Sequence, residues 1–85
     1  MKKYKKKFLF DYIIGNDMGE TDINELEKDP EFIIEVTDLS NDKNIYNLCD
    51  QKLKQNFRLM KFLILKFKDD KKFAKKVARD YIENS

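Results

Sequence analysis

The side chains of this chain that could do chemistry are carboxylates, lysines and one thiol, because the sequence contains no histidine. Cys49 is the single cysteine, so it has no disulfide partner within the chain, and no histidine can activate its thiol. We expect a small buried residue in a reducing, cytoplasmic setting, with a reactive thiol as the alternative. No Ser-His-Asp, Cys-His or glycine-rich phosphate-binding motif occurs. We therefore expect a protein that is not an enzyme.

One acidic loop invites comparison with a calcium site. It contains Asn16, Asp17, Glu20 and Asp22. An EF-hand loop needs alternating acidic positions, a central glycine and a glutamate at its twelfth position. Gly19 lies too close to Asp17 and no suitable spacing follows. We expect a helix-capping loop here, and we expect neither a metal nor another cofactor.

Charge is arranged as two basic ends around an acidic middle. Residues 1–10 hold five lysines, residues 11–42 hold eleven acids and one lysine, and residues 43–85 hold twelve bases and five acids, which gives a net charge of +2. Such an arrangement orients a partner or draws the two halves of the fold together.

The acidic middle is the first candidate for a partner-binding face. Helix capping and interactions with helix dipoles account for some of its acids, but eleven acids in thirty-two residues exceed that need. We expect a non-enzymatic binding or regulatory module, such as an inhibitor or adaptor from a mobile element, with another protein as its partner and no small-molecule substrate. The candidate acidic face comprises Asp17, Glu20, Asp22, Glu25, Glu27 and Glu31.

The basic C-terminal part is the second candidate. Its lysines could contact phosphates, so a nucleic-acid-binding protein is the alternative function. The chain has only two arginines, the residue type most suited to bidentate base recognition, and a solvated helix face is the simpler interpretation. The candidate basic face comprises Lys66, Lys68, Lys71, Lys72, Lys75, Lys76 and Arg79.

Composition predicts one all-α domain over residues 1–85, with a possible short N-terminal arm at residues 1–7. The chain has 41% hydrophobic residues but only two glycines and one proline, which favours helices joined by short links over many strands and turns. The apolar run Phe8–Leu9–Phe10 ends at Asp11, so we expect no signal peptide and no membrane segment.

Periodicity leaves residues 4–14 open between two structures. Phe8, Leu9, Tyr12 and Ile13 have helical spacing, whereas Phe8, Phe10, Tyr12 and Ile14 alternate as in a strand. We favour the helix, because no second strand is evident that could pair with this one.

The remaining elements form a compact bundle of five or six short helices in stacked hairpins. Thr21 or Asp22 caps a short helix, and Asp29-Pro30-Glu31 begins one over residues 30–39. Further helices cover residues 43–49, 57–67 and 70–83, and the helix at 57–67 is apolar nearly all round, as expected of the central one. The predicted core cluster comprises Phe32, Val36, Phe62, Leu63, Phe73 and Val77.

Three consecutive segments also resemble a repeated unit. They are the capped Asp-x-x-Phe helix at Asp29, the stretch from Asn44 to Asn56 and the apolar helix that follows. Asp29 and Asp70 are each followed by Phe at +3 and Val at +7. Over residues 28–83 the pattern is similar to that of an uncharacterised bacterial helical-repeat family. The resemblance implies stacked helices and brings no catalytic residue; Asn56 stands where the family tends to have Asp, and Tyr46 is one position out of step.

Overall fold

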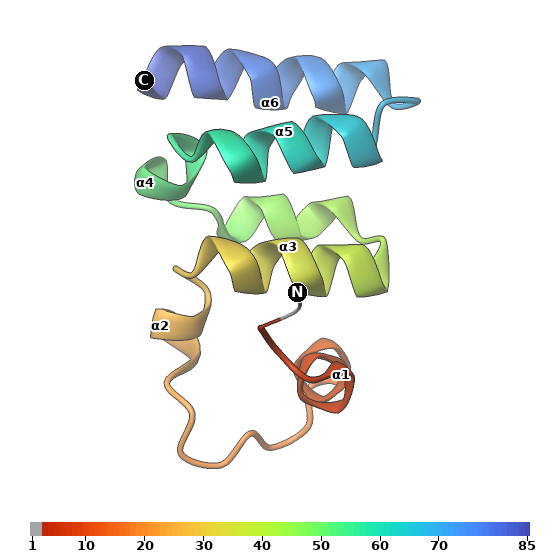
Figure 1. Cartoon of the computed structure of the whole chain (residues 1–85), viewed down its shortest axis with the longest axis vertical. Helices are drawn as coiled ribbons and strands as arrows, with labels where there is room; N and C mark the ends of the chain where they lie inside the picture. Colours follow the sequence, from red (N-terminus) through yellow and green to blue (C-terminus); the bar gives the residue numbers. More distant parts are fainter. Residues whose placement is uncertain (1–2) are drawn as a thin grey trace.

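In the computed structural model, which describes residues 3–85, the chain forms six α-helices and one 3-10 helix, with no strand among these residues (Figure 1). The predicted all-α bundle is confirmed. The elements are α1 (Lys6–Ile14), α2 (Ile23–Leu26), α3 (Pro30–Ser40), the 3-10 helix η1 (Lys43–Leu48), α4 (Gln51–Lys54), α5 (Phe57–Lys66) and α6 (Lys71–Asn84). Helix α4 is the element that the sequence patterns did not predict.

Residues 6–14 adopt the helical alternative. Leu9 is buried in the core, whereas Phe10 and Ile14, which a strand would place on the same face as Tyr12, are about half exposed. Tyr4 and Tyr12 instead pack edge-on against Phe32, with ring centroids 5.4 and 4.9 Å away. The helix ends at Gly15, whose φ of 78° is readily adopted only by glycine.

Short polar side chains begin the other helices. Six elements start at an Asp or Asn whose side chain accepts a hydrogen bond from a backbone N–H of the first turn. Each such cap stabilises its helix by about 0.5–2 kcal/mol. This explains how a chain with few turn residues separates so many short helices. The capping residues are Asp22, Asp29, Asp42, Asp50, Asn56 and Asp70.

The helices from α3 onward are stacked, with α6 at one end of the stack and α1 lying across α3 at the other (Figure 1). Helix α5 packs against α3, α4 and α6, which confirms it as the central helix. Phe32, Val36, Leu63 and Val77 are completely buried in one core. Phe62 and Phe73 are only half-buried and pack against that core from its edge.

The residues before α1 are held against α3. The backbone N–H groups of Lys3 and Tyr4 donate to the carboxylate of Glu35, at 2.8 and 3.1 Å. Glu35 is buried, and these two hydrogen bonds satisfy a charge that would otherwise be costly to bury. Of the arm expected at residues 1–7, residues 1–2 lie outside the described residues, and Lys6 and Lys7 begin α1.

Among residues 3–85, no helix has both the length and the hydrophobicity needed to cross a membrane.

Candidate functional site

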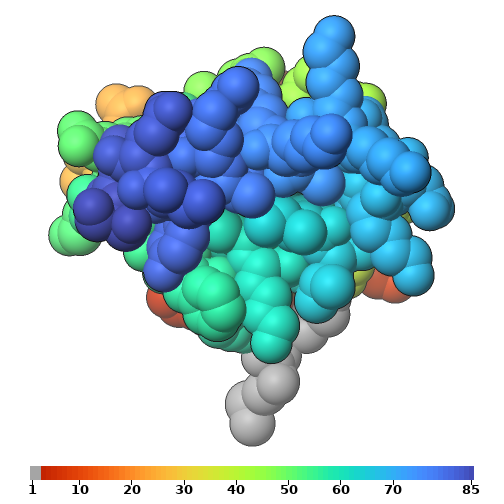
Figure 2. Space-filling view, turned by 90° about the horizontal axis from the view of Figure 1, so that it is seen from above, coloured from red at the N-terminus to blue at the C-terminus, as the bar shows by residue number. Residues whose placement is uncertain are grey.

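The outer side of α6 carries a basic surface, which we define as Lys72, Lys75, Lys76 and Arg79. All four side chains are exposed. Phe73 and Val77 on the opposite side face the core, so helical geometry directs these cations outward. Figure 2 looks onto the molecule from the α6 side, and residues of α6 cover much of the visible face.

Part of the basic surface is hollowed. An open groove of about 480 Å³ is lined by all four cations together with Lys43, Asp70 and Phe73. Lys43 forms an ion pair with Asp70, and this hydrogen bond lowers the pKa of the Asp70 carboxyl. Lys76 Nζ lies 5.7 Å from the centre of the Tyr46 ring. Within residues 3–85, no carboxylate lies within 4 Å of the charged groups of the basic surface.

Like charges repel one another along the N-terminal half of α6. Lys71–Lys75, Lys72–Lys76 and Lys75–Arg79 are like-charged pairs at i,i+4, each of which costs about 0.2–0.5 kcal/mol. The first turn contains lysines and no acid, although the helix dipole favours acids there. Lys76–Asp80 and Arg79–Glu83 have the same spacing with opposite charges, so the repulsion is concentrated in the N-terminal half of α6.

The other members of the predicted basic face lie elsewhere. Lys66, at the end of α5, is largely covered, and its Nζ lies 3.4 Å from the carboxylate of Asp38 on α3. Lys68 is exposed in the turn after α5, and Lys71 is exposed at the start of α6. The structure therefore brings four of the seven predicted residues together on one surface and sets Lys66 apart.

The six residues of the predicted acidic face differ in exposure: Asp17, Glu20, Asp22 and Glu25 are exposed, whereas Glu27 and Glu31 are half-buried. Asp17 and Glu20 are exposed in the loop between α1 and α2, and Asp17 accepts a hydrogen bond from the backbone of Gly19. Asp22 caps α2, and the carboxylate of Glu25 lies 3.8 Å from Lys28 Nζ.

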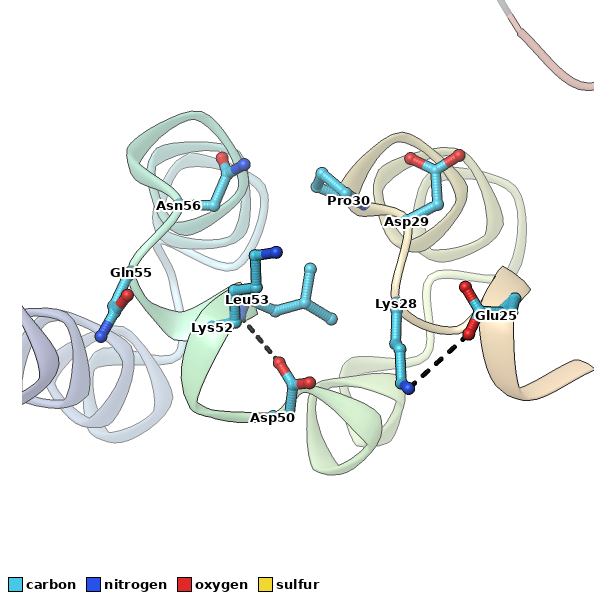
Figure 3. A pocket seen from close by; sticks show the side chains of 9 residues that line it. All are labelled: Glu25, Lys28, Asp29, Pro30, Asp50, Lys52, Leu53, Gln55 and Asn56. Carbon is cyan, nitrogen blue, oxygen red and sulfur yellow. Dashed lines mark hydrogen bonds and ion pairs between the residues drawn. The ribbon is translucent and has the colours of Figure 1, made fainter.

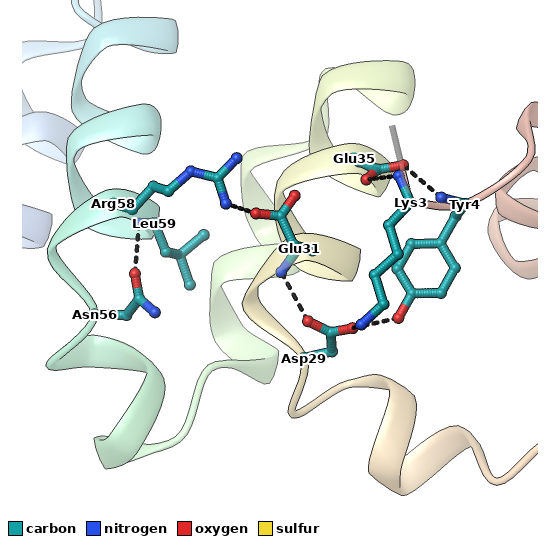
Figure 4. Close-up of polar contacts among 8 residues, drawn as sticks. All are labelled: Lys3, Tyr4, Asp29, Glu31, Glu35, Asn56, Arg58 and Leu59. Carbon is teal, nitrogen blue, oxygen red and sulfur yellow. Dashed lines mark hydrogen bonds and ion pairs between the residues drawn. The ribbon is translucent and has the colours of Figure 1, made fainter. Parts of the chain in front are cut away.

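Glu27 and Glu31 bind groups from other elements. Glu27 accepts a hydrogen bond from the hydroxyl of Tyr12 at 2.5 Å, which joins α1 to the segment before α3. Glu31 forms an ion pair with Arg58 and so joins α3 to α5 (Figure 4).

The acids beside them are also engaged. Asp29 accepts hydrogen bonds from Lys3 Nζ at 2.7 Å and from the hydroxyl of Tyr4 (Figure 4). Partial burial pulls the pKa of Asp29 upward, but these hydrogen bonds outweigh it and hold the pKa below its ordinary value. Much of the charge in the acidic middle therefore acts within the fold.

The sequence patterns did not reveal an apolar groove between α5 and α6. This groove has a volume of about 230 Å³ and is lined by Phe57, Met60, Lys61, Ile64, Leu65, Ala78, Tyr81 and Ile82. Phe57, Leu65 and Ile82 have 60%, 59% and 71% of their surface exposed. Exposed large apolar residues that cluster in this way are typical of interaction sites. The signal in the sequence was that α5 has more apolar residues than one buried face can use.

A third opening lies at the N-terminal ends of α3 and α5 (Figure 3). It has a volume of about 660 Å³ and is lined by charges of both signs. Five of its polar residues have partners within the fold, because Asp29, Asp50 and Asn56 cap three helices and Glu25 pairs with Lys28. Lys52 and Gln55 are the remaining polar residues of its lining.

The Cys49 thiol and the carboxylates are the remaining groups that could do chemistry. Cys49 is buried, and burial raises the pKa of its thiol to about 12, so the thiolate needed for reactivity is scarce at neutral pH. Within residues 3–85, no group of three or more Cys, Asp or Glu side chains could hold a metal ion.

No protein-family model, no curated protein and no solved structure matches this chain. The resemblance to a bacterial helical-repeat family stays a prediction.

Proposed function

We propose that this protein is a non-enzymatic binding module that contacts an acidic protein through the basic surface of α6. The observation that carries the proposal is the uneven pairing of charge. Glu27, Asp29 and Glu31 bind groups within the fold, whereas the four cations of the basic surface have no carboxylate within 4 Å among the described residues. A negatively charged partner would supply the missing counter-charges and relieve the repulsion along α6.

A protein partner is favoured over nucleic acid by what lies beside the basic surface. The neighbouring side of α6 carries Ala78 and Ile82 in the apolar groove. Aliphatic groups such as Leu65 and Ile82 gain little from a phosphate backbone, whereas protein interfaces combine an apolar centre with a charged rim. Nucleic-acid binding is the second candidate, because the same four cations could neutralise phosphates.

The test compares two variants with equal changes in charge. Lys72→Gln/Lys75→Gln/Lys76→Gln removes three charges from the basic surface. Lys5→Gln/Lys6→Gln/Lys7→Gln removes three exposed lysines at the opposite end of the stack. Both are used as bait in extracts of the source cell, with mass spectrometry of the bound proteins. We expect acidic proteins to bind the wild type and the α1 variant, to be lost from the α6 variant, and to elute with salt.

Duplex and single-stranded oligonucleotides, titrated at about 50 mM salt, where non-specific contacts are easiest to detect, test the second candidate. Binding whose affinity falls steeply with salt, and whose salt dependence is weaker in the α6 variant, would replace the protein partner with nucleic acid. Equal retention of partners by both variants would overturn the role of the basic surface.

A further inference from the structure

We propose that the apolar groove between α5 and α6 is the docking site for an amphipathic helix of the partner protein, with acidic residues flanking its apolar stripe. This inference rests on the proposed function for the negative charge of the partner. It adds the form of the segment that is bound and the place where its apolar side chains enter.

The shape of the groove matches one face of a helix. Its α5 side runs from Phe57 to Leu65, which at 1.5 Å per residue is about 12 Å, or about two helical turns. Its α6 side is formed by Ala78, Tyr81 and Ile82, and the small side chain of Ala78 leaves space between the larger ones. Apolar residues at i, i+3, i+4 and i+7 of a partner helix would extend over this distance.

The rim of the groove sets the charge of the partner. Lys61 lines the groove, and no acidic residue does. Lys75 precedes Ala78 by three positions and Ile82 by seven, so it lies on the same side of α6 and joins the groove to the basic surface. An apolar stripe flanked by Glu or Asp would meet both lysines.

The same rim disfavours a second copy of this chain as the occupant. Two copies meeting through the groove would bring Lys61 and Lys75 of each together, and like charges facing each other across an interface are unfavourable. A nucleic acid would satisfy the lysines but leave Phe57, Leu65 and Ile82 without apolar contacts.

The probe is a fluorescein-labelled synthetic peptide of about fourteen residues, or about four helical turns, with leucines at the spacing given above and glutamates beside them. One control peptide has lysines in place of the glutamates. A second has the same composition with the leucine stripe scrambled. Fluorescence anisotropy measures the affinity of each peptide for the full chain.

The groove variant is Leu65→Gln/Ile82→Gln. Its matched control, Phe10→Gln/Ile14→Gln, changes two exposed apolar residues of α1, and circular dichroism verifies that both variants fold. We expect the glutamate-flanked peptide to bind the wild type and the α1 control equally, and the groove variant about tenfold or more weakly. The lysine-flanked and scrambled peptides should bind the wild type at least about tenfold more weakly than the glutamate-flanked peptide does.

Equal binding of the striped and scrambled peptides, or unchanged affinity of the groove variant, would overturn the docking site. Dimerisation of the wild type that Leu65→Gln/Ile82→Gln abolishes would also overturn it in favour of a second copy, and oligonucleotide binding lost in this variant would do so in favour of nucleic acid. Lys72→Gln/Lys76→Gln separates the two proposals. If Lys72→Gln/Lys76→Gln abolishes peptide binding and the groove substitutions do not, the proposed function is supported and the docking site is not. If only the groove substitutions abolish binding, the docking site is supported and the role of the basic surface is not.

Discussion

The hydroxyl of Tyr46 donates a hydrogen bond to the carboxylate of Asp80 at 2.5 Å, and so joins η1 to α6 across 34 positions of sequence. Tyr46 is buried, and Lys54 Nζ lies 3.9 Å from the same carboxylate. Burial and the neighbouring Asp80 raise the pKa of Tyr46, so the phenol stays protonated and remains a donor. This contact positions the helix that carries the basic surface.

Replacing Tyr46 with Phe should destabilise the protein by about 1.5–3 kcal/mol, since a hydrogen bond to a charged group is lost and the Asp80 carboxylate loses a partner. Urea unfolding followed by circular dichroism measures the change. Tyr81→Phe is the matched control on α6, because its hydroxyl makes no hydrogen bond within the described residues, and it should change stability by less than about 0.5 kcal/mol. Equal effects of the two substitutions would show that the Tyr46 hydrogen bond contributes little.

Two leucines of α5 test the register of the central helix. Leu63 is completely buried, whereas Leu65 has 59% of its surface exposed. Leu63→Ala should cost about 2–5 kcal/mol, because it removes apolar contacts and leaves a cavity. Leu65→Ala removes the same atoms from an exposed position and should cost less than about 0.5 kcal/mol. Thermal or urea unfolding of the pair decides the matter, and similar losses would mean that α5 is rotated from the orientation described.

Local sequence patterns predicted much of this fold, because the residues that begin its helices act on neighbouring residues in the chain. Asp29-Pro30 and Asn56 act on the next few residues, and such caps are visible in sequence. Helix α4 escaped prediction because four residues with one buried leucine show no periodicity. The two patterns in residues 4–14 overlap, and the lack of a partner strand favoured the helix. The packing of Tyr4 and Tyr12 against Phe32, which is distant in sequence, left no local pattern.

The candidate site was harder to predict than the fold. The positions of the α6 cations follow from helical periodicity and were foreseen. Whether a charge is paired depends on contacts such as Tyr12 with Glu27 and Arg58 with Glu31, which join distant segments and leave no local pattern. The groove between α5 and α6 could not be predicted for the same reason. The sequence of a helix that is apolar nearly all round does not show which of its faces stays exposed in the fold.

Acid should weaken the fold through Asp29. Its pKa is lower in the folded protein than the 3.8 of the free side chain, so the unfolded chain takes up the proton first as the pH falls. The resulting stability is fully present above pH 3.8 and is lost as the pH falls toward the folded pKa. Urea midpoints between neutral pH and about pH 3, below the unfolded pKa of an aspartate, should therefore decline.

Asp29→Asn isolates this effect, because asparagine retains the helix-capping oxygen but not the charge. The variant should be less stable than the wild type at pH 7, and the difference should shrink on acidification. Asp69→Asn, at an exposed position in the turn before α6, is the control. A constant difference between Asp29→Asn and the wild type across this pH range would contradict the role assigned to the Asp29 charge.

The ion pair between Glu31 and Arg58 distinguishes internal pairing of the acidic segment from a partner-facing role. Glu31 keeps 25% and Arg58 68% of its side-chain surface exposed, so a double-mutant cycle with alanine should give a coupling of only about 0.2–1 kcal/mol. The exchanged variant Glu31→Arg/Arg58→Glu should recover part of the loss caused by Glu31→Arg alone. Glu25→Arg should reduce stability less than Glu31→Arg, because Glu25 and Lys28 are exposed residues three positions apart and their contact joins no separate elements.

Salt completes this test. At about 0.5 M NaCl, where the Debye length is only a few ångströms, the coupling between Glu31 and Arg58 should shrink and the melting temperature of the wild type should fall slightly. The repulsion among the lysines of α6 opposes that fall, so Lys72→Gln/Lys75→Gln/Lys76→Gln should show a larger decrease with salt than the wild type. If the melting temperatures of both the wild type and this variant rise with salt, repulsion within the acidic segment outweighs its internal pairs. That result would return Asp17, Glu20, Asp22 and Glu25 to consideration as a surface for a basic partner.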